Sequence, residues 1–521
     1  MGELGGFLRL ERVGFRKRDP RERVRDYRQY FALPDDQTLR EQGGRCMDCG
    51  VPFCQEGCPL GNKIPDWNDL VYADQWREAL TQLHATNNFP EFTGLICPAP
   101  CESACVLDIN DDPVTIEQIE LAIVTRGFDE GWIAALPPDE RSGRTVGVIG
   151  SGPAGLAVAA ELNRHGHEVT VYERDEGPGG MLRFGVPDAK LEKWIIDRRV
   201  ALLEEEGVAF EYGVDVGRSV SVSELRARHD AVVVAIGSRV HRDLDVPGHD
   251  LDGVHFAMDY LYQRNRHVAR EEGRYATPEP DNPITAAEKR VVVVGGGDTG
   301  MDCISNALRE RASDVLLLDV YPPLPGERRP QGTPWPLPPK RTPTTYALDE
   351  GGERRFGTQV TAIVGEDGRV TAVEGRRVQG TSSRDLHAIP GSEFTEPADL
   401  VLVAIGFSHP EHEGAVEELG VDLDARGNVK APVYATSETG AFACGDARVG
   451  QSLVVTAIAE GRRCARVVDR FLGGSGETRR VPASALFAVE DGDPHSLRHQ
   501  AETARTVTVG DAFWSGPREG S

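Results

Sequence analysis

The residues with the clearest chemistry are cysteines, and seven of the ten in this chain fall in one stretch near the amino terminus. Their spacing begins C-x2-C-x4-C-x3-C-P, close to the bacterial ferredoxin run C-x2-C-x2-C-x3-C-P with a longer middle gap. A second group reads C-x3-C-x3-C. This cysteine block consists of Cys46, Cys49, Cys54, Cys58, Cys97, Cys101 and Cys105. Two [4Fe–4S] clusters would use eight ligands, so the block is one ligand short of that number.

Zinc and disulfides are the alternatives for such a block. Seven thiolates exceed one tetrahedral zinc site, and the nearest histidine, His84, lies outside both cysteine groups. Disulfides are disfavoured because the count is odd, no secretion signal is recognisable, and cytosolic thiols stay reduced. The three remaining cysteines, Cys303, Cys444 and Cys464, have no CxxC partner and are expected to be small core residues.

A glycine-rich turn follows an apolar strand predicted at 145–149. Gly150, Gly152 and Gly155 have GxGxxG spacing, which lets the backbone turn tightly and approach a pyrophosphate at the start of the next helix. Glu173 ends the following predicted strand, where a carboxylate can accept the two ribose hydroxyls. Strand, turn, helix and acidic residue together predict a dinucleotide-binding unit.

Two further motifs are typical of FAD-binding flavoproteins. Gly179 and Gly180 follow the second strand of the first unit, and Gly445 and Asp446 follow an apolar strand near the far end of the chain. In such proteins the paired glycines lie by the cofactor, and the Gly-Asp pair places a carboxylate near the ribityl chain and pyrophosphate. Residues 430–475 must therefore return to the first unit after the second has been inserted.

The glycine spacing occurs again at Gly295, Gly297 and Gly300, after a strand predicted at 291–294. We expect a nicotinamide dinucleotide here, and Asp319 at the end of the next strand favours NADH because it repels a 2′-phosphate. Nearby arginines could instead pair with that phosphate. They are Arg309, Arg311, Arg328 and Arg329.

Hydride transfer from a nicotinamide to a flavin needs stacked rings and excluded water, because the cofactors carry the chemistry. We therefore expect no catalytic side chain. The fold class that positions these sites is α/β, with two nested Rossmann-like domains preceded by an α-helical iron–sulfur domain. The expected domains are 1–140 for the clusters, 141–255 with 430–475 for FAD, 256–429 for NAD(P)H, and 476–521 as a polar carboxyl-terminal extension.

The charge of the chain limits its partners. With 83 acidic and 58 basic residues the formal net charge is −25, which argues against nucleic acid and against an anionic membrane surface. No apolar run approaches the roughly 18 residues that a spanning helix needs. We expect a cytoplasmic protein with protein and small-molecule partners.

The motifs also resemble a known family. Residues 45–72, reading RCMDCGVPFCQEGCPLGNKIPDWNDLVY, are similar to the small (β) subunit of bacterial glutamate synthase. So are ICPAPCESAC from Ile96, GSGPAGLA from Gly150, GGGDTGMDC from Gly295, and CGDARVGQSLVVTAIAEGRR from Cys444. The resemblance runs in order from about residue 40 to 472.

This resemblance implies an activity and a partner. In that family NADPH reduces FAD, and electrons pass through [4Fe–4S] clusters to the FMN of a large (α) subunit, which converts L-glutamine and 2-oxoglutarate to L-glutamate. It favours NADPH here without excluding NADH. The chain itself has no amino-terminal catalytic cysteine and no pattern of an FMN barrel, so we expect it to be the reducing half.

The resemblance also implies how the ligands are divided between the two clusters. One cluster would take Cys46, Cys49, Cys54 and Cys105, and the other Cys58, Cys97 and Cys101. The related dihydropyrimidine dehydrogenase completes its second cluster with a glutamine. Counted from Pro113, the matching position is Glu120, for which a solvated helical glutamate is the competing interpretation.

Two alternatives remain open. One is a stand-alone NAD(P)H oxidoreductase that reduces ferredoxin or another acceptor without glutamate chemistry. The other is a non-enzyme, a nucleotide-sensing scaffold whose cysteines bind structural zinc.

Overall fold

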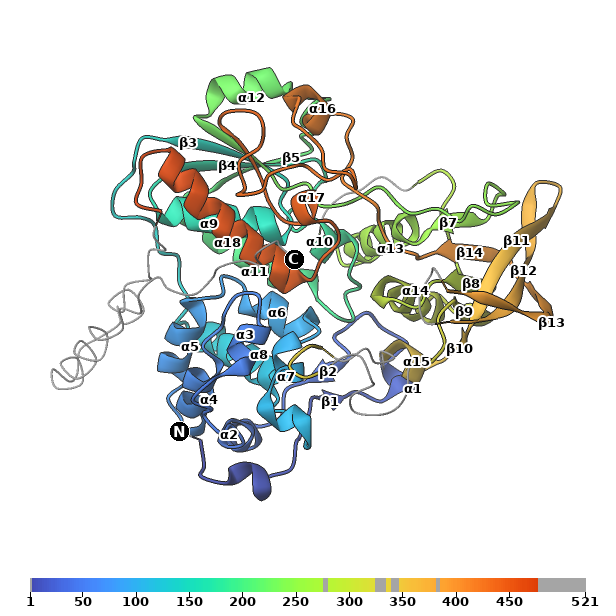
Figure 1. Ribbon diagram of the computed structural model, residues 1–521, viewed down its shortest axis with the longest axis horizontal. Coiled ribbons are helices and arrows are strands. Elements are labelled where there is room, and N and C mark those ends of the chain that lie inside the picture. Colours follow the sequence, from blue (N-terminus) through green and yellow to red (C-terminus); the bar gives the residue numbers. More distant parts are fainter. Residues whose placement is uncertain (1, 275–279, 324–333, 339–345, 381–384, 477–521) are drawn as a thin grey trace, which may run out of the picture. The chain divides into compact units, whose positions relative to one another are not determined.

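The computed structural model describes residues 2–274, 280–323, 334–338, 346–380 and 385–476 (Figure 1). Arg328 and Arg329 lie outside the described residues, and so does the carboxyl-terminal extension apart from Gly476. None of the helices among the described residues is long and apolar enough to cross a membrane.

The amino-terminal part is built from short helices around Trp67, whose side chain is completely buried. Prolines in the first turn start several of these helices, where a missing N–H costs nothing. Two of the helices, over Ile64–Tyr72 and Trp76–His84, are separated at Asp74, which has a positive φ of 65°. The helices are α2 (Asp36–Gly44), α3 (Phe53–Gly57), α4 (Ile64–Tyr72), α5 (Trp76–His84), α6 (Pro90–Ile96), α7 (Pro100–Ser103) and α8 (Ile116–Asp129).

Smaller elements precede and join these helices. A segment of the first 32 residues carries a two-stranded antiparallel pairing and runs to the nucleotide-binding part of the chain. These elements are the 3-10 helices at Gly6–Leu8 and Val106–Ile109, β1 (Arg16–Lys17), α1 (Pro20–Arg23) and β2 (Phe31–Ala32).

The first Rossmann-like domain has a five-stranded parallel sheet in the order β15-β6-β3-β4-β5. Its central strands are continuous apolar runs, as expected for a parallel sheet covered on both faces. The strands are β3 (Thr145–Ile149), β4 (Glu168–Glu173), β5 (Ala209–Tyr212), β6 (Ala231–Val234) and β15 (Ala441–Ala443). The helices are α9 (Pro153–Arg164), α10 (Met181–Phe184), α11 (Lys193–Glu205), α12 (Val222–Arg228), α16 (Ala415–Leu419), α17 (Asp446–Val449) and α18 (Val454–Phe471).

The second Rossmann-like domain repeats this arrangement with the parallel order β10-β9-β8-β14-β7. In both sheets the strand that precedes the glycine turn lies in the centre. The strands are β7 (Val254–Phe256), β8 (Arg290–Val294), β9 (Asp314–Asp319), β10 (Glu353–Phe356) and β14 (Leu400–Val403), and the helices are α13 (Ala257–Glu271), α14 (Asp298–Arg309) and α15 (Tyr346–Glu350). An antiparallel sheet of β11 (Thr358–Glu366), β12 (Arg369–Gln379) and β13 (His387–Pro397) is inserted before β14.

The predicted α/β class with two nested dinucleotide units after a helical domain is confirmed. The chain returns to the first domain earlier than residue 430, however. Ala415, Val416 and Leu419 of α16 pack in one apolar cluster with Val222 and Leu225 of the first domain. The apolar spacing of α16 gave no sign of which sheet it covers, because that choice depends on packing between distant segments.

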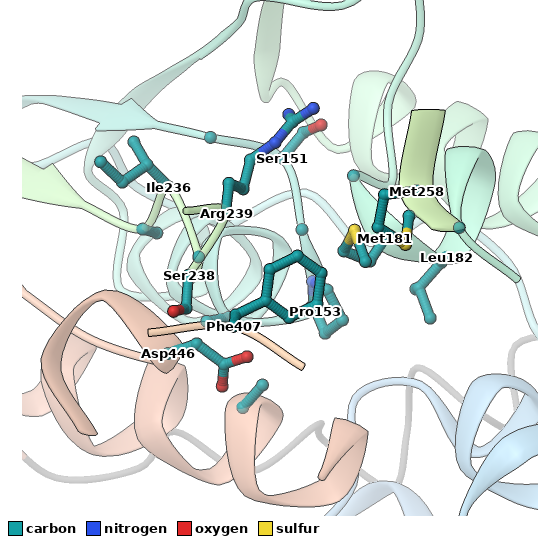
Figure 2. Close-up of a pocket in the computed structure, with 18 of the residues that line it drawn as sticks. Ser151, Pro153, Met181, Leu182, Ile236, Ser238, Arg239, Met258, Phe407 and Asp446 are labelled. Atoms are coloured by element: carbon teal, nitrogen blue, oxygen red, sulfur yellow. The ribbon is translucent and has the colours of Figure 1, made fainter. Parts of the chain in front are cut away.

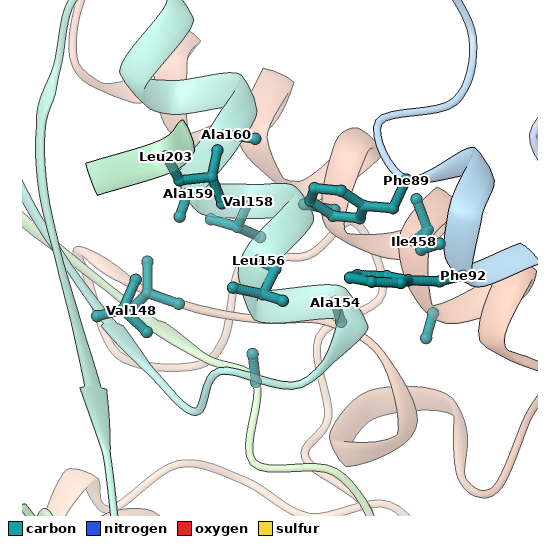
Figure 3. Close-up of a cluster of buried hydrophobic side chains, with 14 of the residues drawn as sticks. Phe89, Phe92, Val148, Ala154, Leu156, Val158, Ala159, Ala160, Leu203 and Ile458 are labelled. Carbon is teal, nitrogen blue, oxygen red and sulfur yellow. The ribbon is translucent and has the colours of Figure 1, made fainter. Parts of the chain in front are cut away.

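The helical domain packs directly on the first Rossmann-like domain. Phe89 and Phe92, at the start of α6, lie against Ala154 of α9 and Ile458 of α18 in one buried cluster (Figure 3). Gly461 lets α18 and α9 approach closely, because a Cβ there would lie 2.3 Å from the carbonyl oxygen of Ala154. The beginnings of α9, α18 and α6 are thereby held together.

Candidate cofactor sites

The first glycine turn has the shape that a pyrophosphate site needs. Gly150 has φ of 101°, and a Cβ on it would lie 2.6 Å from the carbonyl oxygen of Ala235. A Cβ on Gly155 would lie 2.0 Å from the carbonyl oxygen of Gly150. A Cβ on Gly152 would instead project into open space. Since no side chain caps α9, its first N–H groups remain available for an anion in that space.

Glu173 lies at the end of β4, where the sequence placed it. Its buried carboxylate accepts hydrogen bonds from the backbone N–H of Ser151 at 3.0 Å, from the Ser151 hydroxyl, and from the N–H of Asp175. Burial raises the pKa of Glu173, and these hydrogen bonds oppose the increase. Ser151 was not predicted, although its place between two glycines of the turn was a usable signal. It ties the carboxylate to the glycine turn.

A cavity of about 330 Å³ runs from this turn, and we name it the central cavity. Gly152, Glu173 and Gly180 line it. Asp446 of α17, labelled in Figure 2, lines it as well. Gly179 stands next to Gly180, and both have positive φ. The paired glycines and the Gly-Asp motif therefore meet across one cavity, although more than 250 positions separate them.

Asp446 is held in the central cavity by its neighbours. Gly445 has φ of 64°, and a Cβ there would lie 2.7 Å from Cβ of Ala154 in α9. The Asp446 carboxylate accepts a hydrogen bond from the Ser452 hydroxyl at 2.5 Å, and burial raises its pKa to about 6. An apolar part of the wall comes from Met181, Met258, Leu261 and Phe407, which suits a flat aromatic ring system.

The second glycine turn reproduces the first. Gly295 has φ of 122°, and a Cβ there would lie 2.3 Å from the carbonyl oxygen of Ala404. A Cβ on Gly300 would lie 2.2 Å from the carbonyl oxygen of Gly295, whereas one on Gly297 would meet nothing within 4 Å. Helix α14 starts at this turn without a side-chain cap. The central cavity extends to Asp298 and Thr299 in its first turn, so the two nucleotide units face one space.

The charge at the second turn differs from the sequence expectation. Asp319 ends β9 as predicted, but Arg354 of β10 donates to its carboxylate at 2.6 Å and to the carbonyl oxygen of Gly296 at 3.2 Å. Arg309 does not face this site: its buried side chain pairs with Glu350. No signal in the sequence pointed to Arg354, because its place depends on the pairing of β10 with β9.

Four cysteines line a small cavity in the helical domain, which we name the outer thiol cavity. They are Cys46, Cys49, Cys54 and Cys105. Cys105 comes from a segment far along the chain, and α3 and α7 bring it close: Gly57 of α3 faces Ala104, where a Cβ would lie only 2.4 Å from the alanine Cβ. Burial raises the pKa of the Cys54 thiol to about 12, so a thiolate in this place requires a positively charged partner.

The other three cysteines of the block, Cys58, Cys97 and Cys101, line a second cavity, the inner thiol cavity. Glu120 of α8 lies on the same wall, with 5% of its surface exposed. It is therefore not a solvated glutamate. Glu117, one turn earlier on α8, lines this cavity too.

The Glu120 carboxylate is held in a fixed orientation. Its Oε1 accepts hydrogen bonds from Asn87 Nδ2 at 2.7 Å and from Thr93 Oγ1 at 2.6 Å. Burial raises its pKa to about 7, against the effect of these two hydrogen bonds. Both bonds use Oε1, which leaves Oε2 for another partner.

The chemistry of these two cavities fits iron–sulfur clusters. Among the described residues, no three cysteine, histidine or carboxylate side chains are arranged to hold a single metal ion. The thiols instead surround a space, as the ligands of a multi-iron cluster do. The remaining cysteines, Cys303, Cys444 and Cys464, are fully buried in apolar clusters, as expected for core residues.

Comparison with known proteins agrees with both parts of the chain. The family model for pyridine nucleotide-disulphide oxidoreductases matches residues 144–461. The model for dihydropyrimidine dehydrogenase domain II, 4Fe–4S cluster, matches residues 23–132. The cofactors are therefore FAD, a pyridine nucleotide and [4Fe–4S] clusters. Among solved structures, FprA from Mycobacterium tuberculosis has the same fold over 70% of this chain and 90% of its own, with a TM-score of 0.50 and 20% identity.

Relatives with curated names extend over nearly the whole chain. Glutamate synthase [NADPH] small chain from Mycobacterium tuberculosis is 49% identical over 477 residues, which are 91% of this chain and 97% of that protein. Glutamate synthase [NADH] from Schizosaccharomyces pombe is 44% identical over 91% of this chain, but the match spans only 23% of that longer protein. Motifs, cavities and relatives agree, and the chain belongs to the glutamate synthase small-chain family of oxidoreductases.

Proposed function

We propose that this chain is the reducing subunit of a glutamate synthase. It oxidises NADPH through FAD and passes the electrons through two [4Fe–4S] clusters to a large subunit. That partner contains FMN and makes L-glutamate from L-glutamine and 2-oxoglutarate. The observation that carries the proposal is the order of three adjoining cavities: the central cavity, the inner thiol cavity and the outer thiol cavity.

The central cavity and the inner thiol cavity share a wall. Ile96 and Pro98 line the central cavity, while Cys97 between them lines the inner one. The start of α18 does the same, with Val454 on the central side and Val455 on the inner side. A group bound in the central cavity is therefore one residue away from a cluster ligand.

The inner and outer thiol cavities also adjoin. Ile64 and Ile116 line both of them. The outer cavity is the one nearer to solvent, because Cys49 is partly exposed whereas Cys58 and Cys101 are buried. This order supports a one-way relay from the central cavity through the inner cluster to the outer cluster and then to a partner.

The ligand sets follow from the same arrangement. We assign Cys46, Cys49, Cys54 and Cys105 to the outer cluster. The inner cluster would take Cys58, Cys97 and Cys101. Glu120 would be its fourth ligand, and so the eighth of the two clusters together. Glu120 is preferred to Glu117 because two hydrogen bonds fix its carboxylate. Its charge also acts on all three inner thiols, whose pKa values it raises.

The two nucleotide sites would bind FAD and the nicotinamide dinucleotide. When bound, FAD supplies a centre that takes two electrons at once and gives them up singly. The chain binds its pyrophosphate at Gly150, Gly152 and Gly155 and orients it with Glu173 and Asp446. Gly179 and Gly180 allow close approach beside it. The second dinucleotide would lie on Gly295, Gly297 and Gly300, with its nicotinamide end reaching the apolar wall of the central cavity.

NADPH is the preferred dinucleotide on the basis of Arg354. A lone Asp319 would repel a 2′-phosphate, but a guanidinium at 2.6 Å neutralises the carboxylate and can itself pair with phosphate. The bacterial relatives are named for NADPH and the fission-yeast relative for NADH, so both choices occur in the family.

A separate large subunit is the proposed partner. The match to this chain spans only 23% of the fission-yeast glutamate synthase, so the larger part of that protein has no counterpart here. The described residues form a helical domain and two Rossmann-like domains, the second with an inserted antiparallel sheet. We place this activity in the cytoplasm, where both dinucleotides and reduced thiols are available.

Anaerobic reconstitution tests the proposal. The purified chain alone should bleach its FAD absorbance on addition of NADPH and reduce its clusters, without forming glutamate. Addition of the large subunit should yield two glutamates for each NADPH oxidised. A chain that reduces ferredoxin with high activity and binds no large subunit would instead establish the stand-alone oxidoreductase.

A further inference from the structure

An ion pair crosses the central cavity between the two Rossmann-like domains. Lys190 lies in the loop before α11 of the first domain, and Asp302 lies in the second turn of α14. Lys190 Nζ is 2.8 Å from Asp302 Oδ1, and both residues line the central cavity. The Asp302 side chain is 7% exposed, so the pair is largely shielded from water.

The loop that carries Lys190 is fixed from several sides. Lys193, itself buried, donates to the carbonyl oxygens of Val186 at 2.6 Å and Leu191 at 2.8 Å. Asp188 pairs with Arg274, which follows α13 of the second domain, at 2.7 Å. These contacts fix the backbone of the loop, so the ammonium group of Lys190 is held in one place.

The amino-terminal segment reinforces the same junction. The backbone N–H of Tyr30 donates to the carbonyl oxygen of Ala189 at 3.0 Å. The Tyr30 ring stacks on Tyr346 of α15 with centroids 4.3 Å apart. Since α15 packs beside α14, three parts of the chain converge on the Lys190–Asp302 pair.

The location of the pair gives it a role in the reaction. Asp298 and Thr299, one turn earlier on α14, lie at the start of the helix where the second dinucleotide would bind. The other side of the cavity carries the FAD motifs. The distance between the two domains therefore sets the distance between two bound ring systems, and an error of about 1 Å in such a distance can cost about 100-fold in rate.

We propose that Lys190 and Asp302 are a positioning pair that holds the nicotinamide-binding domain against the FAD-binding domain at the spacing hydride transfer requires. This inference rests on the proposed function. In the step it serves, the hydride leaves C4 of the nicotinamide with both electrons of the C–H bond and forms the N–H bond at flavin N5. The two side chains exchange no atom with either ring system.

The pair must be ionised to act. Burial raises the pKa of Asp302 to about 6, against the effect of Lys190. Burial lowers and Asp302 raises the pKa of Lys190, with a net increase above its ordinary value. The other groups that act on Asp302 are Lys193, Asp298, the Cys303 thiol, and the phenols of Tyr346 and Tyr30. At pH 7 both partners are charged, and below about pH 6 the carboxylate becomes protonated and the pair is lost.

Stopped-flow reduction of FAD in the holoenzyme tests the role. In Lys190→Met and Asp302→Asn the rate of flavin bleaching at saturating NADPH should fall about 10- to 100-fold. The NADPH dissociation constant and the FAD content should stay within about twofold of the parent. Lys190→Arg, which keeps the charge, should restore most of the rate. The parent rate should also decline below about pH 6, and Asp302→Asn should lose that decline.

A measurement on the resting enzyme is independent of turnover. Amide hydrogen exchange should rise in residues 186–192 and in α14 of Lys190→Met, and stay unchanged in α12. The matched control is Arg369→Met, which breaks the exposed ion pair with Asp252 and should alter neither readout. The inference would be overturned if Lys190→Met and Asp302→Asn both reduced FAD at the parent rate. It would also be overturned if they raised the NADPH dissociation constant but left the rate at saturating NADPH unchanged. Failure of NADPH to bleach the unmodified protein would refute the proposed function instead.

Discussion

Arg354 and Asp319 form an ion pair of 2.6 Å beside the second glycine turn, with only 6% and 8% of their side chains exposed. The two residues lie on neighbouring parallel strands, β10 and β9. The pair leaves room only for a glycine at position 296, because a Cβ there would lie 2.1 Å from the Asp319 carboxylate. A carboxylate that ordinarily selects against NADPH is thereby neutralised where the adenosine ribose of the dinucleotide is expected.

The first prediction concerns this pair. Arg354→Met should lower kcat/KM for NADPH about 10- to 100-fold, because a hydrogen bond to a charged group contributes about 1.5–3 kcal/mol. NADH should be affected much less, since it has no 2′-phosphate. Flavin reduction with each dinucleotide measures the ratio. Arg311, which the sequence also offered as a phosphate partner, is exposed and follows the end of α14 opposite to the glycine turn, so Arg311→Met serves as the control. An equal loss with both dinucleotides would mean that Arg354 supports the fold and not the phosphate.

The second prediction separates the two nucleotide sites. Gly152→Val should lose FAD, and Gly297→Val should keep FAD but lose NADPH binding. A Cβ at either position would meet no protein atom within 4 Å, so neither variant is expected to unfold. Bound flavin is counted by absorbance and NADPH binding by titration. Loss of the same cofactor from both proteins would contradict the assignment of two sites.

The third prediction concerns the relay. Cys49→Ala should remove the outer cluster and Cys58→Ala the inner one, with about half the iron lost in each. NADPH should still bleach FAD in both variants, because the hydride step precedes the clusters. Electron paramagnetic resonance of the reduced proteins measures which cluster remains. Cys303→Ala, in the core of the second domain, should keep all the iron. Loss of flavin reduction with FAD still bound would reverse the proposed order.

The fourth prediction concerns the missing ligand. Glu120→Ala should reduce the iron content and the signal of the inner cluster, whereas Glu120→Gln should retain both because an amide oxygen can replace the carboxylate. Glu117→Ala is the matched control on the same wall of the inner thiol cavity. Iron and sulfide analysis of anaerobic protein gives the result. If Glu120→Ala keeps its full iron content, Glu120 is not a cluster ligand, and its carboxylate serves only to accept the hydrogen bonds of Asn87 and Thr93.

Some features of this protein could be predicted because they are local. Gly150 and Gly295 adopt positive φ, and Gly155 and Gly300 stand where a Cβ would strike a carbonyl oxygen, so spacing alone identified both turns. The cysteine spacings likewise indicate iron–sulfur ligation by themselves, because short gaps between thiols are typical of cluster ligands. Such patterns are readable because the constraint acts between residues a few positions apart.

The sequence by itself thus determined the fold class, the two glycine turns and the chemistry of the cysteine block. Tertiary structure alone decided that Arg354 neutralises Asp319, that Arg309 is occupied by Glu350, and that Lys190 meets Asp302. It also decided the order of the three cavities. These relationships join residues that strand pairing and helix packing bring together from distant parts of the chain. Hydrophobic burial sets those contacts, and it depends on shape and volume in three dimensions and not on spacing along the chain.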